Sequence, residues 1–199
     1  MHLERNYTQM ADGTMLLAGH NIHSLVQQFG SPLVVILEDV IRFNCRAYIK
    51  EMQKYPRSRV YYASKALLTT GICRIMDAEG LGIDVVSQGE LQTALAAGFP
   101  ADRMLMHGNA KTVQDLAAAL RAGVGRIVID NTEEIDRLAA LARAMHVTPK
   151  VMLRVAPGIK PSTHRYVQTG QVDSKFGFDL EGGAARAAAV KVLETGALE

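Results

Sequence analysis

Short apolar segments alternate with helix-like segments along most of the chain, and this order limits the possible folds more than any other feature. The apolar segments, rich in β-branched residues, predict strands at 59–64, 82–86, 103–107, 126–130 and 150–155. Segments with helical periodicity separate them, at 69–79, 87–97, 112–122 and 131–145. Continuous apolar strands between amphipathic helices are typical of a parallel sheet that is buried on both faces.

Two α/β architectures share this pattern, an open doubly wound sheet and a (β/α)8 barrel. Periodicity alone does not distinguish them. A closed barrel typically needs about 250 residues, whereas this chain has 199 and the pattern gives five strands between residues 59 and 155. The chain is therefore expected to be too short to close a barrel.

The pattern differs at the two ends of the chain. Near the start, Asn21 is a candidate N-cap for a helix over 21–29, the run 33–37 after Pro32 predicts a buried strand, and 40–54 is helical in pattern. Near the end, the polar stretch 157–178 interrupts the alternation and is typical of a functional loop or an interface. A helix over 180–195 then leads to no further strand, which indicates truncation.

Composition excludes several classes of protein. The net charge is +2 and the basic residues are scattered, which argues against a nucleic-acid binder. No apolar run approaches the roughly 18–20 residues of a membrane span, and the first residues lack the apolar region of a secretory signal. Cys45 and Cys73 have no CxxC spacing, so neither a disulfide framework nor a cysteine-rich zinc site is expected. These observations favour a cytoplasmic protein.

Polar residues follow or interrupt the predicted strands, where α/β barrels carry their chemistry. Lys65 ends the first of these strands, and burial there would favour a neutral amine that can form a Schiff base with an aldehyde such as pyridoxal phosphate. The alternative is a lysine whose ammonium reaches water. Asp84 lies inside an apolar strand and needs a partner, which could be Lys65, a cofactor or the next loop. Arg154 needs an anion or a carboxylate, and Glu90 is the expected acid of a capping box with Ser87.

Other motifs give weaker signals. His107, His164 and Lys175 show no metal-ligand spacing, so no metal site is predicted. The segment 80–85 lacks the third glycine of a dinucleotide fingerprint, and 108–112 lacks the adjacent Gly-Lys of a P-loop.

Several motifs, taken in order, resemble the pyridoxal-phosphate-dependent decarboxylases of the alanine-racemase-like fold, over about residues 13–180. The matching motifs are Tyr62-Ala63-Ser64-Lys65-Ala66, Gly82-Ile83-Asp84-Val85-Val86-Ser87, Gly89-Glu90-Leu91, His107-Gly108-Asn109, Leu153-Arg154-Val155, Thr163-His164 and Asp173-Ser174-Lys175-Phe176-Gly177-Phe178.

The resemblance implies a partial, pyridoxal-phosphate-binding (β/α)8 TIM-type barrel, truncated before closure. Residues 59–199 would form about five βα units of it, and residues 1–58 would supply a lead-in helix and a strand, 33–37, belonging to a separate β-domain. Lys65 matches the lysine that holds pyridoxal 5'-phosphate, and Asp84, Glu90 and Arg154 match polar residues around the cofactor. Other family motifs, including the glycine-rich phosphate loop, would lie beyond Glu199, so the chain resembles the first half of such an enzyme and is expected to be weak or inactive alone.

Within the family, the likeness is greatest to members that convert meso-diaminopimelate to L-lysine and CO2. It implies a small amino-acid substrate and a homodimer for the full-length enzyme, with no nucleic acid or membrane partner. Members acting on ornithine, arginine or carboxynorspermidine remain alternatives. So do a non-catalytic relative that binds the cofactor and a phosphate-binding barrel of unrelated chemistry.

Overall fold

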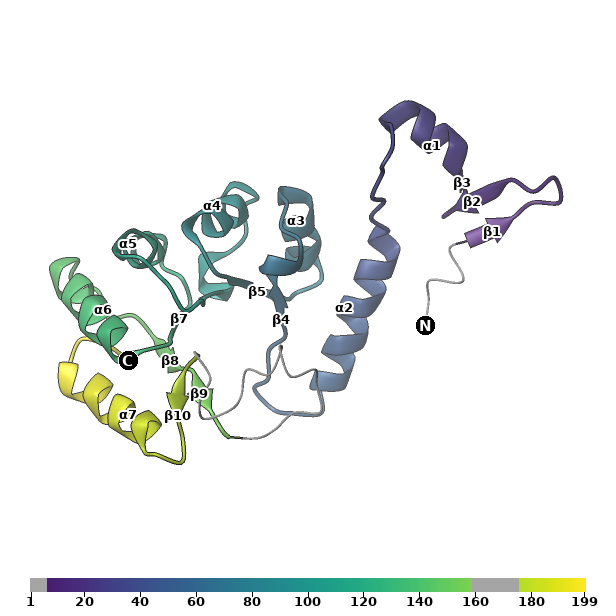
Figure 1. The fold of residues 1–199 in the computed structure, drawn as a ribbon. Helices are drawn as coiled ribbons and strands as arrows, with labels where there is room; N and C mark the ends of the chain where they lie inside the picture. The colour runs from purple at the N-terminus through teal and green to yellow at the C-terminus, as the bar shows by residue number, and fades with distance from the viewer. Residues whose placement is uncertain (1–6, 159–175) are drawn as a thin grey trace. The chain divides into compact units, whose positions relative to one another are not determined.

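The computed structural model describes residues 7–158 and 176–199 (Figure 1). The chain divides into two compact units, Met1–Ser58 and Arg59–Glu199. Within the described ranges, no helix is both long enough and apolar enough to cross a membrane.

The first unit contains a small antiparallel sheet and two helices. The strands are β1 (Tyr7–Gln9), β2 (Met15–Leu17) and β3 (His20–Asn21), and the helices are α1 (Ile22–Phe29) and α2 (Glu38–Met52). Asn21 caps α1 as predicted, because its side-chain oxygen accepts a hydrogen bond from the His23 backbone N–H at 2.8 Å.

The strand predicted over residues 33–37 is wrong. These residues form no strand, and Val34 is 84% exposed. Their β-branched side chains favour an extended backbone, but a strand also needs a neighbouring strand, and none of the described strands pairs with this segment. The strands of this unit lie earlier, between Tyr7 and Asn21, and are too short to show a sequence period.

The second unit is built on five parallel strands that pair in chain order, as the sequence predicts. They are β4 (Tyr61–Ala63), β5 (Gly82–Val85), β6 (Met104–Met106), β7 (Arg126–Ile129) and β8 (Val151–Leu153). Two short 3-10 turns accompany them, η2 (Ser64–Ala66) after β4 and η3 (Ala101–Arg103) before β6.

All the helices of this unit lie along one side of an arc of strands (Figure 1). They are α3 (Thr70–Ala78), α4 (Gln88–Ala96), α5 (Val113–Ala122), α6 (Thr132–Ala144) and α7 (Ala184–Thr195). A doubly wound sheet carries helices on both faces, whereas a (β/α)8 barrel carries them only outside. The arrangement is therefore that of a partial barrel, and it confirms the predicted fold class.

The core of the unit lies between the sheet and these helices. Alternate strand residues are almost completely buried there: Ile83, Val85, Met104, Met106, Ile127 and Ile129 are each no more than 1% exposed. Because side chains alternate between the two faces of a strand, Asp84 and its row of neighbours face the opposite, inner side of the arc. The sheet thus separates an apolar core from the face that carries the polar residues.

Parallel pairing continues past β8. After Arg154 the chain forms β9 (Val155–Ala156), which pairs with β10 (Phe178–Asp179), a short strand that the sequence pattern does not predict. Gly177 adopts φ +73°, and a Cβ there would lie 2.7 Å from the carbonyl oxygen of Arg154, so a glycine is required for this close approach.

The residues after α7 also pair with this edge. The Glu199 backbone N–H donates to the Pro149 carbonyl at 3.0 Å, and its carbonyl accepts from the Val151 N–H at 2.6 Å. This is the bonding pattern of a parallel ladder beside Lys150. No strand is predicted after this helix from the sequence, but Glu199 pairs with the edge of the sheet as a strand residue would.

Candidate functional site

The polar residues of the second unit gather at the carboxyl ends of β4 to β8. Parallel strands bring these ends to one edge of a sheet, which is where α/β barrels place their active sites. Lys65 follows β4, Asp84 lies in β5, His107 follows β6, Asp130 follows β7 and Arg154 follows β8.

Lys65 lies in η2 and is exposed, which matches the alternative of a lysine whose ammonium reaches water rather than that of a buried amine. Lys65 follows β4, which is the first strand of the described five-stranded sheet. No ion pair joins Lys65 to Asp84 or Arg154 within the part of the chain that the structure describes. The Lys65 amine is therefore accessible at the strand end.

The turn that carries Lys65 is nevertheless anchored to the sheet. Ser64 is buried, and its hydroxyl donates to Glu90 Oε2 at 2.6 Å. The same Glu90 oxygen accepts the Val86 backbone N–H at 2.7 Å. The Ser87 side chain caps α4 by accepting the Glu90 N–H at 3.3 Å, so half of the predicted capping box forms. Glu90 connects the ends of β4 and β5 to the start of α4, instead of closing the box on Ser87.

Asp84 pairs with His107 across β5 and β6. Its Oδ2 lies 3.2 Å from His107 Nδ1, and both side chains are largely buried. Asp84 also lies in register with Ala63 of β4, two residues before Lys65. Asp84 therefore has a protein partner, which is His107 after the neighbouring strand β6 rather than Lys65.

Two atoms of this pair lack partners. Asp84 Oδ1 and His107 Nε2 are buried and have no hydrogen-bond partner in the described structure. An unsatisfied buried polar atom typically costs about 1–3 kcal/mol. A polar ligand at this point would recover that cost, which marks the carboxyl ends of β4 to β6 as a ligand-accepting edge.

Arg154 has the carboxylate partner that the sequence predicts. Its guanidinium donates to Asp130 Oδ1 at 3.0 Å, and Asp130 is only 4% exposed. The guanidinium also lies over the Phe176 ring, 4.4 Å from its centroid. These two contacts hold Arg154 at the strand-end edge with its positive charge next to a carboxylate.

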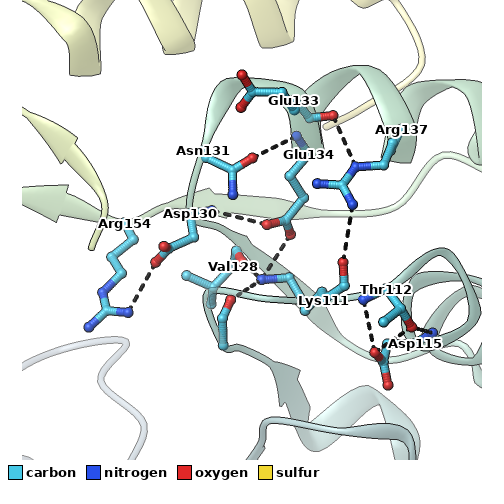
Figure 2. Close-up of polar contacts among 11 residues, drawn as sticks. Lys111, Thr112, Asp115, Val128, Asp130, Asn131, Glu133, Glu134, Arg137 and Arg154 are labelled. Atoms are coloured by element: carbon cyan, nitrogen blue, oxygen red, sulfur yellow. Dashed lines mark hydrogen bonds and ion pairs between the residues drawn. The ribbon is translucent and has the colours of Figure 1, made fainter. Parts of the chain in front are cut away.

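A buried ion pair lies behind Arg154 and Asp130, and the sequence analysis misses it (Figure 2). Lys111 Nζ lies 2.8 Å from Glu134 Oε1, and neither side chain is more than 1% exposed. Burial raises the pKa of the Glu134 carboxyl, and the positive charge of Lys111 opposes this shift. Glu134 takes the capping-box position after Asn131, so its sequence position suggests a helix cap and not an ion pair.

The described part of the chain offers no candidate metal site. Within residues 7–158 and 176–199, no cluster of His, Cys, Asp or Glu could hold a metal ion. Cys45 and Cys73 are buried thiols, and burial raises the pKa of Cys73. His164 and Lys175 lie outside the described residues.

The donor set at this edge fits a small anionic aldehyde such as pyridoxal phosphate. Lys65 offers an accessible amine, which is the group that bonds an aldehyde carbon. Asp84 Oδ1 and His107 Nε2 offer unsatisfied polar atoms, and Arg154 offers a cation. The residues present therefore match a cofactor that needs a covalent anchor, polar contacts to a ring and a positive charge.

Known proteins show the same combination of fold and sequence. A diaminopimelate decarboxylase from Actinosynnema pretiosum is 44% identical over 187 residues, which cover 94% of this chain and 41% of that protein. One from Mycobacterium leprae is 42% identical over 191 residues, covering 96% of this chain and 40% of that protein. A crystal structure of diaminopimelate decarboxylase from M. jannaschii with L-lysine superimposes with a TM-score of 0.86 and 29% identity, covering 98% of this chain and 46% of that chain.

These comparisons confirm the predicted resemblance, and they show that the chain spans about two-fifths of the length of its curated relatives. Residues 39–198 match the family model of the pyridoxal-dependent decarboxylase, pyridoxal binding domain, which confirms pyridoxal phosphate as the cofactor. The chain therefore belongs to the pyridoxal-dependent decarboxylase family and contains that family's pyridoxal-binding domain.

Proposed function

We propose that the protein carrying this chain is a pyridoxal-phosphate-dependent decarboxylase that converts meso-diaminopimelate to L-lysine and CO2. The observation that carries the proposal is the accessible Lys65 amine after β4, two residues beyond the Ala63 that lies in register with Asp84. The names of the curated relatives and the L-lysine bound to the M. jannaschii structure support the choice of substrate.

The reaction removes CO2 from the substrate and leaves the electron pair of the broken bond at Cα, where one proton must be added. Bound pyridoxal phosphate supplies the electron sink that makes this bond cleavage possible. The protein must supply a covalent anchor, fixed charges around the ring and a proton carrier.

Lys65 is assigned as the anchor and as a proton carrier for Cα. Its position in a 3-10 turn is fixed by Ser64, whose hydroxyl bonds Glu90, while its own side chain extends from the sheet. A lysine that is accessible but carried by an anchored backbone can release and rebind the cofactor without moving the strand. Glu90 is thus a positioning residue for the turn.

The other predicted site residues are assigned by their charges. Asp84, held by His107, presents an unpaired carboxylate oxygen to the cofactor, and Arg154, held by Asp130, presents a cation. Opposite charges at the ends of β5 and β8, on the same edge of the sheet, would orient a ligand that carries both a phosphate and a protonated ring nitrogen.

The wider organisation is also proposed. The unit Arg59–Glu199 serves as the cofactor-binding unit, and the first unit belongs with a second, β-rich domain through β1 to β3 rather than through residues 33–37. We further propose a cytoplasmic homodimer with a small amino-acid substrate and no nucleic-acid or membrane partner.

A product assay tests the proposed function. The purified protein that carries this chain, rather than the chain alone, is mixed with pyridoxal phosphate and one substrate at a time, either meso-diaminopimelate, ornithine, arginine or carboxynorspermidine, and CO2 and amine products are measured. We expect L-lysine from meso-diaminopimelate, lost in Lys65→Ala and retained in Lys150→Ala, where an exposed lysine on another part of the unit is removed.

The other outcomes identify the alternatives. Faster turnover of ornithine, arginine or carboxynorspermidine would assign a different decarboxylase of the family. Cofactor binding with no turnover of any of these substrates would favour a non-catalytic relative and contradict the proposal.

A further inference from the structure

We propose that Lys111 is a positioning residue that fixes the direction of Arg154 at the strand-end edge, acting through Glu134 and the main chain of Asp130. The proposal rests on the proposed function, because it concerns how the residues around the cofactor are held. It assigns a role to a buried ion pair that the decarboxylation chemistry does not use.

The Lys111 ammonium is fully buried and has three polar partners, two carbonyl oxygens and one carboxylate oxygen (Figure 2). It donates to the carbonyls of Gly108 and Val128, the latter at 2.7 Å, and lies 2.8 Å from Glu134 Oε1. These partners come from the loop after β6, from β7 and from the first turn of α6. The Lys111 side chain therefore connects the loop after β6 with β7 and with α6.

Glu134 extends the connection to the residue that ends β7. Its Oε2 accepts the Asp130 backbone N–H at 3.4 Å, while its own N–H is capped by Asn131 at 3.0 Å. Asp130 then accepts the Arg154 guanidinium at 3.0 Å. The path has a cation at each end, Lys111 and Arg154, and two carboxylates between them that are joined through the Asp130 main-chain N–H (Figure 2).

Stability alone does not explain a buried ion pair here. Well-packed apolar side chains of similar volume often stabilise a core as well as a buried ion pair does, because removing two charges from water is costly. The Lys111–Glu134 ion pair differs from apolar side chains in its geometry. Its ammonium also donates to two main-chain carbonyls, so each partner has a fixed direction. Gly108 also contributes to this fixed geometry. Its φ of +106° is a backbone conformation that other residues rarely adopt, and it sets the direction of the carbonyl that Lys111 contacts.

The test is a thermodynamic cycle on cofactor affinity. The dissociation constant of pyridoxal 5'-phosphate is measured by equilibrium dialysis for the wild-type protein, Lys111→Met, Arg154→Met and the double variant. We expect Lys111→Met to weaken binding about tenfold when Arg154 is present and less than about twofold when it is absent. Lys150→Met, at an exposed lysine, should leave affinity unchanged in both backgrounds.

A merely structural role gives a different result. Equal losses from Lys111→Met with and without Arg154 would overturn the inference while leaving the proposed function intact. Failure of the wild-type protein to bind the cofactor would instead contradict the proposed function.

A second variant keeps the test decisive if Lys111→Met does not fold. Lys111→Met/Glu134→Leu replaces the ion pair with apolar groups, so it should fold with near wild-type resistance to urea. We expect its cofactor affinity to remain about tenfold weaker, because no group then holds the Asp130 N–H. Wild-type affinity in this double variant would also overturn the inference.

Discussion

The strand-end edge has two parts that differ in how their polar groups are satisfied. In one part, Lys111 after β6, Glu134 of α6, Asp130 after β7 and Arg154 after β8 are linked by two ion pairs and one main-chain hydrogen bond (Figure 2), and Glu134 Oε1 has the Lys111 charge as its partner but no hydrogen bond within the described residues. At the ends of β4 to β6, Asp84 and His107 bond each other but leave two buried atoms unpaired, and Lys65 is exposed. We call these the paired part and the unpaired part.

This difference indicates which polar groups stabilise the folded chain and which are available to a ligand. Polar groups that satisfy one another gain little from an additional partner, whereas an unsatisfied buried atom is stabilised when a ligand supplies one. Changes in the paired part should therefore lower the free energy of unfolding and, through Arg154, also weaken cofactor binding. Changes in the unpaired part should mainly affect cofactor binding.

The largest expected effect comes from breaking the ion pair in the paired part. Lys111→Met leaves the Glu134 carboxylate buried without its counter-charge and should lower the free energy of unfolding by about 3–5 kcal/mol. Urea unfolding followed by circular dichroism measures this loss. A loss below about 1 kcal/mol would show that the paired part does not depend on this ion pair.

The next effect comes from the outer link of the same series. Asp130→Asn keeps the side-chain shape but removes the charge that faces Arg154, and should cost about 1.5–3 kcal/mol because a hydrogen bond between charged groups is lost. The same unfolding measurement applies, with the exposed Asp136→Asn as the matched control. Equal losses in the free energy of unfolding for Asp130→Asn and Asp136→Asn would contradict the expected contribution of the Asp130–Arg154 pair.

A smaller effect on stability is expected in the unpaired part. Asp84→Asn retains an acceptor for His107 and should change the free energy of unfolding of the cofactor-free protein by less than about 1 kcal/mol. The stabilisation that added pyridoxal phosphate gives to the protein should fall, since ligand binding stabilises the folded state in proportion to its affinity. Thermal unfolding with and without cofactor measures both quantities.

Two results for Asp84→Asn would contradict the assignment of Asp84 to the unpaired part. A large loss of stability without cofactor, or an unchanged gain from the cofactor, would place Asp84 among the groups that hold shape.

The smallest effect is a pH dependence within the paired part. Because burial raises the pKa of Glu134 above 4.5, the folded state holds that proton more tightly than the unfolded chain does. The stability contribution of Glu134 is then complete below pH 4.5 and decreases as pH rises through the raised pKa. The charged groups facing it are Lys111, which opposes the shift, and Asp130, which adds to it.

Glu134→Gln tests this sign, with the exposed neighbour Glu133→Gln as control. The stability of the wild-type protein minus that of Glu134→Gln should fall as pH rises above 4.5, whereas the difference for Glu133→Gln should stay flat. A difference that rises with pH would show that the charge of Lys111 outweighs burial.

Local features of the fold are predictable from the sequence because neighbouring residues determine them. The five parallel strands follow from apolar runs, and the caps of α1, α5 and α6 follow from Asn21, Thr112 and Asn131, whose side chains bond N–H groups two or three residues ahead. The partner of Arg154 is predictable as a class, because a half-buried guanidinium requires an anion.

Features that depend on distant partners are not predictable in this way. Residues 33–37 have strand propensity but no described strand beside them, and β10 is too short to show a period. Lys111 and Glu134 are far apart in sequence and meet only because β6 and β7 pair and α6 folds back over them. The accessible position of Lys65 depends on where the chain leaves β4, which no local pattern specifies.

Covalent mapping of the cofactor tests the central claim most directly. The protein is incubated with pyridoxal phosphate, reduced with borohydride, digested, and its lysines are examined by mass spectrometry. We expect a stable phosphopyridoxyl group on Lys65. The group should be absent from Lys65→Ala and should still form on Lys65 in Lys150→Ala. A label that is missing from Lys65, or spread equally over exposed lysines such as Lys54 and Lys150, would contradict the account.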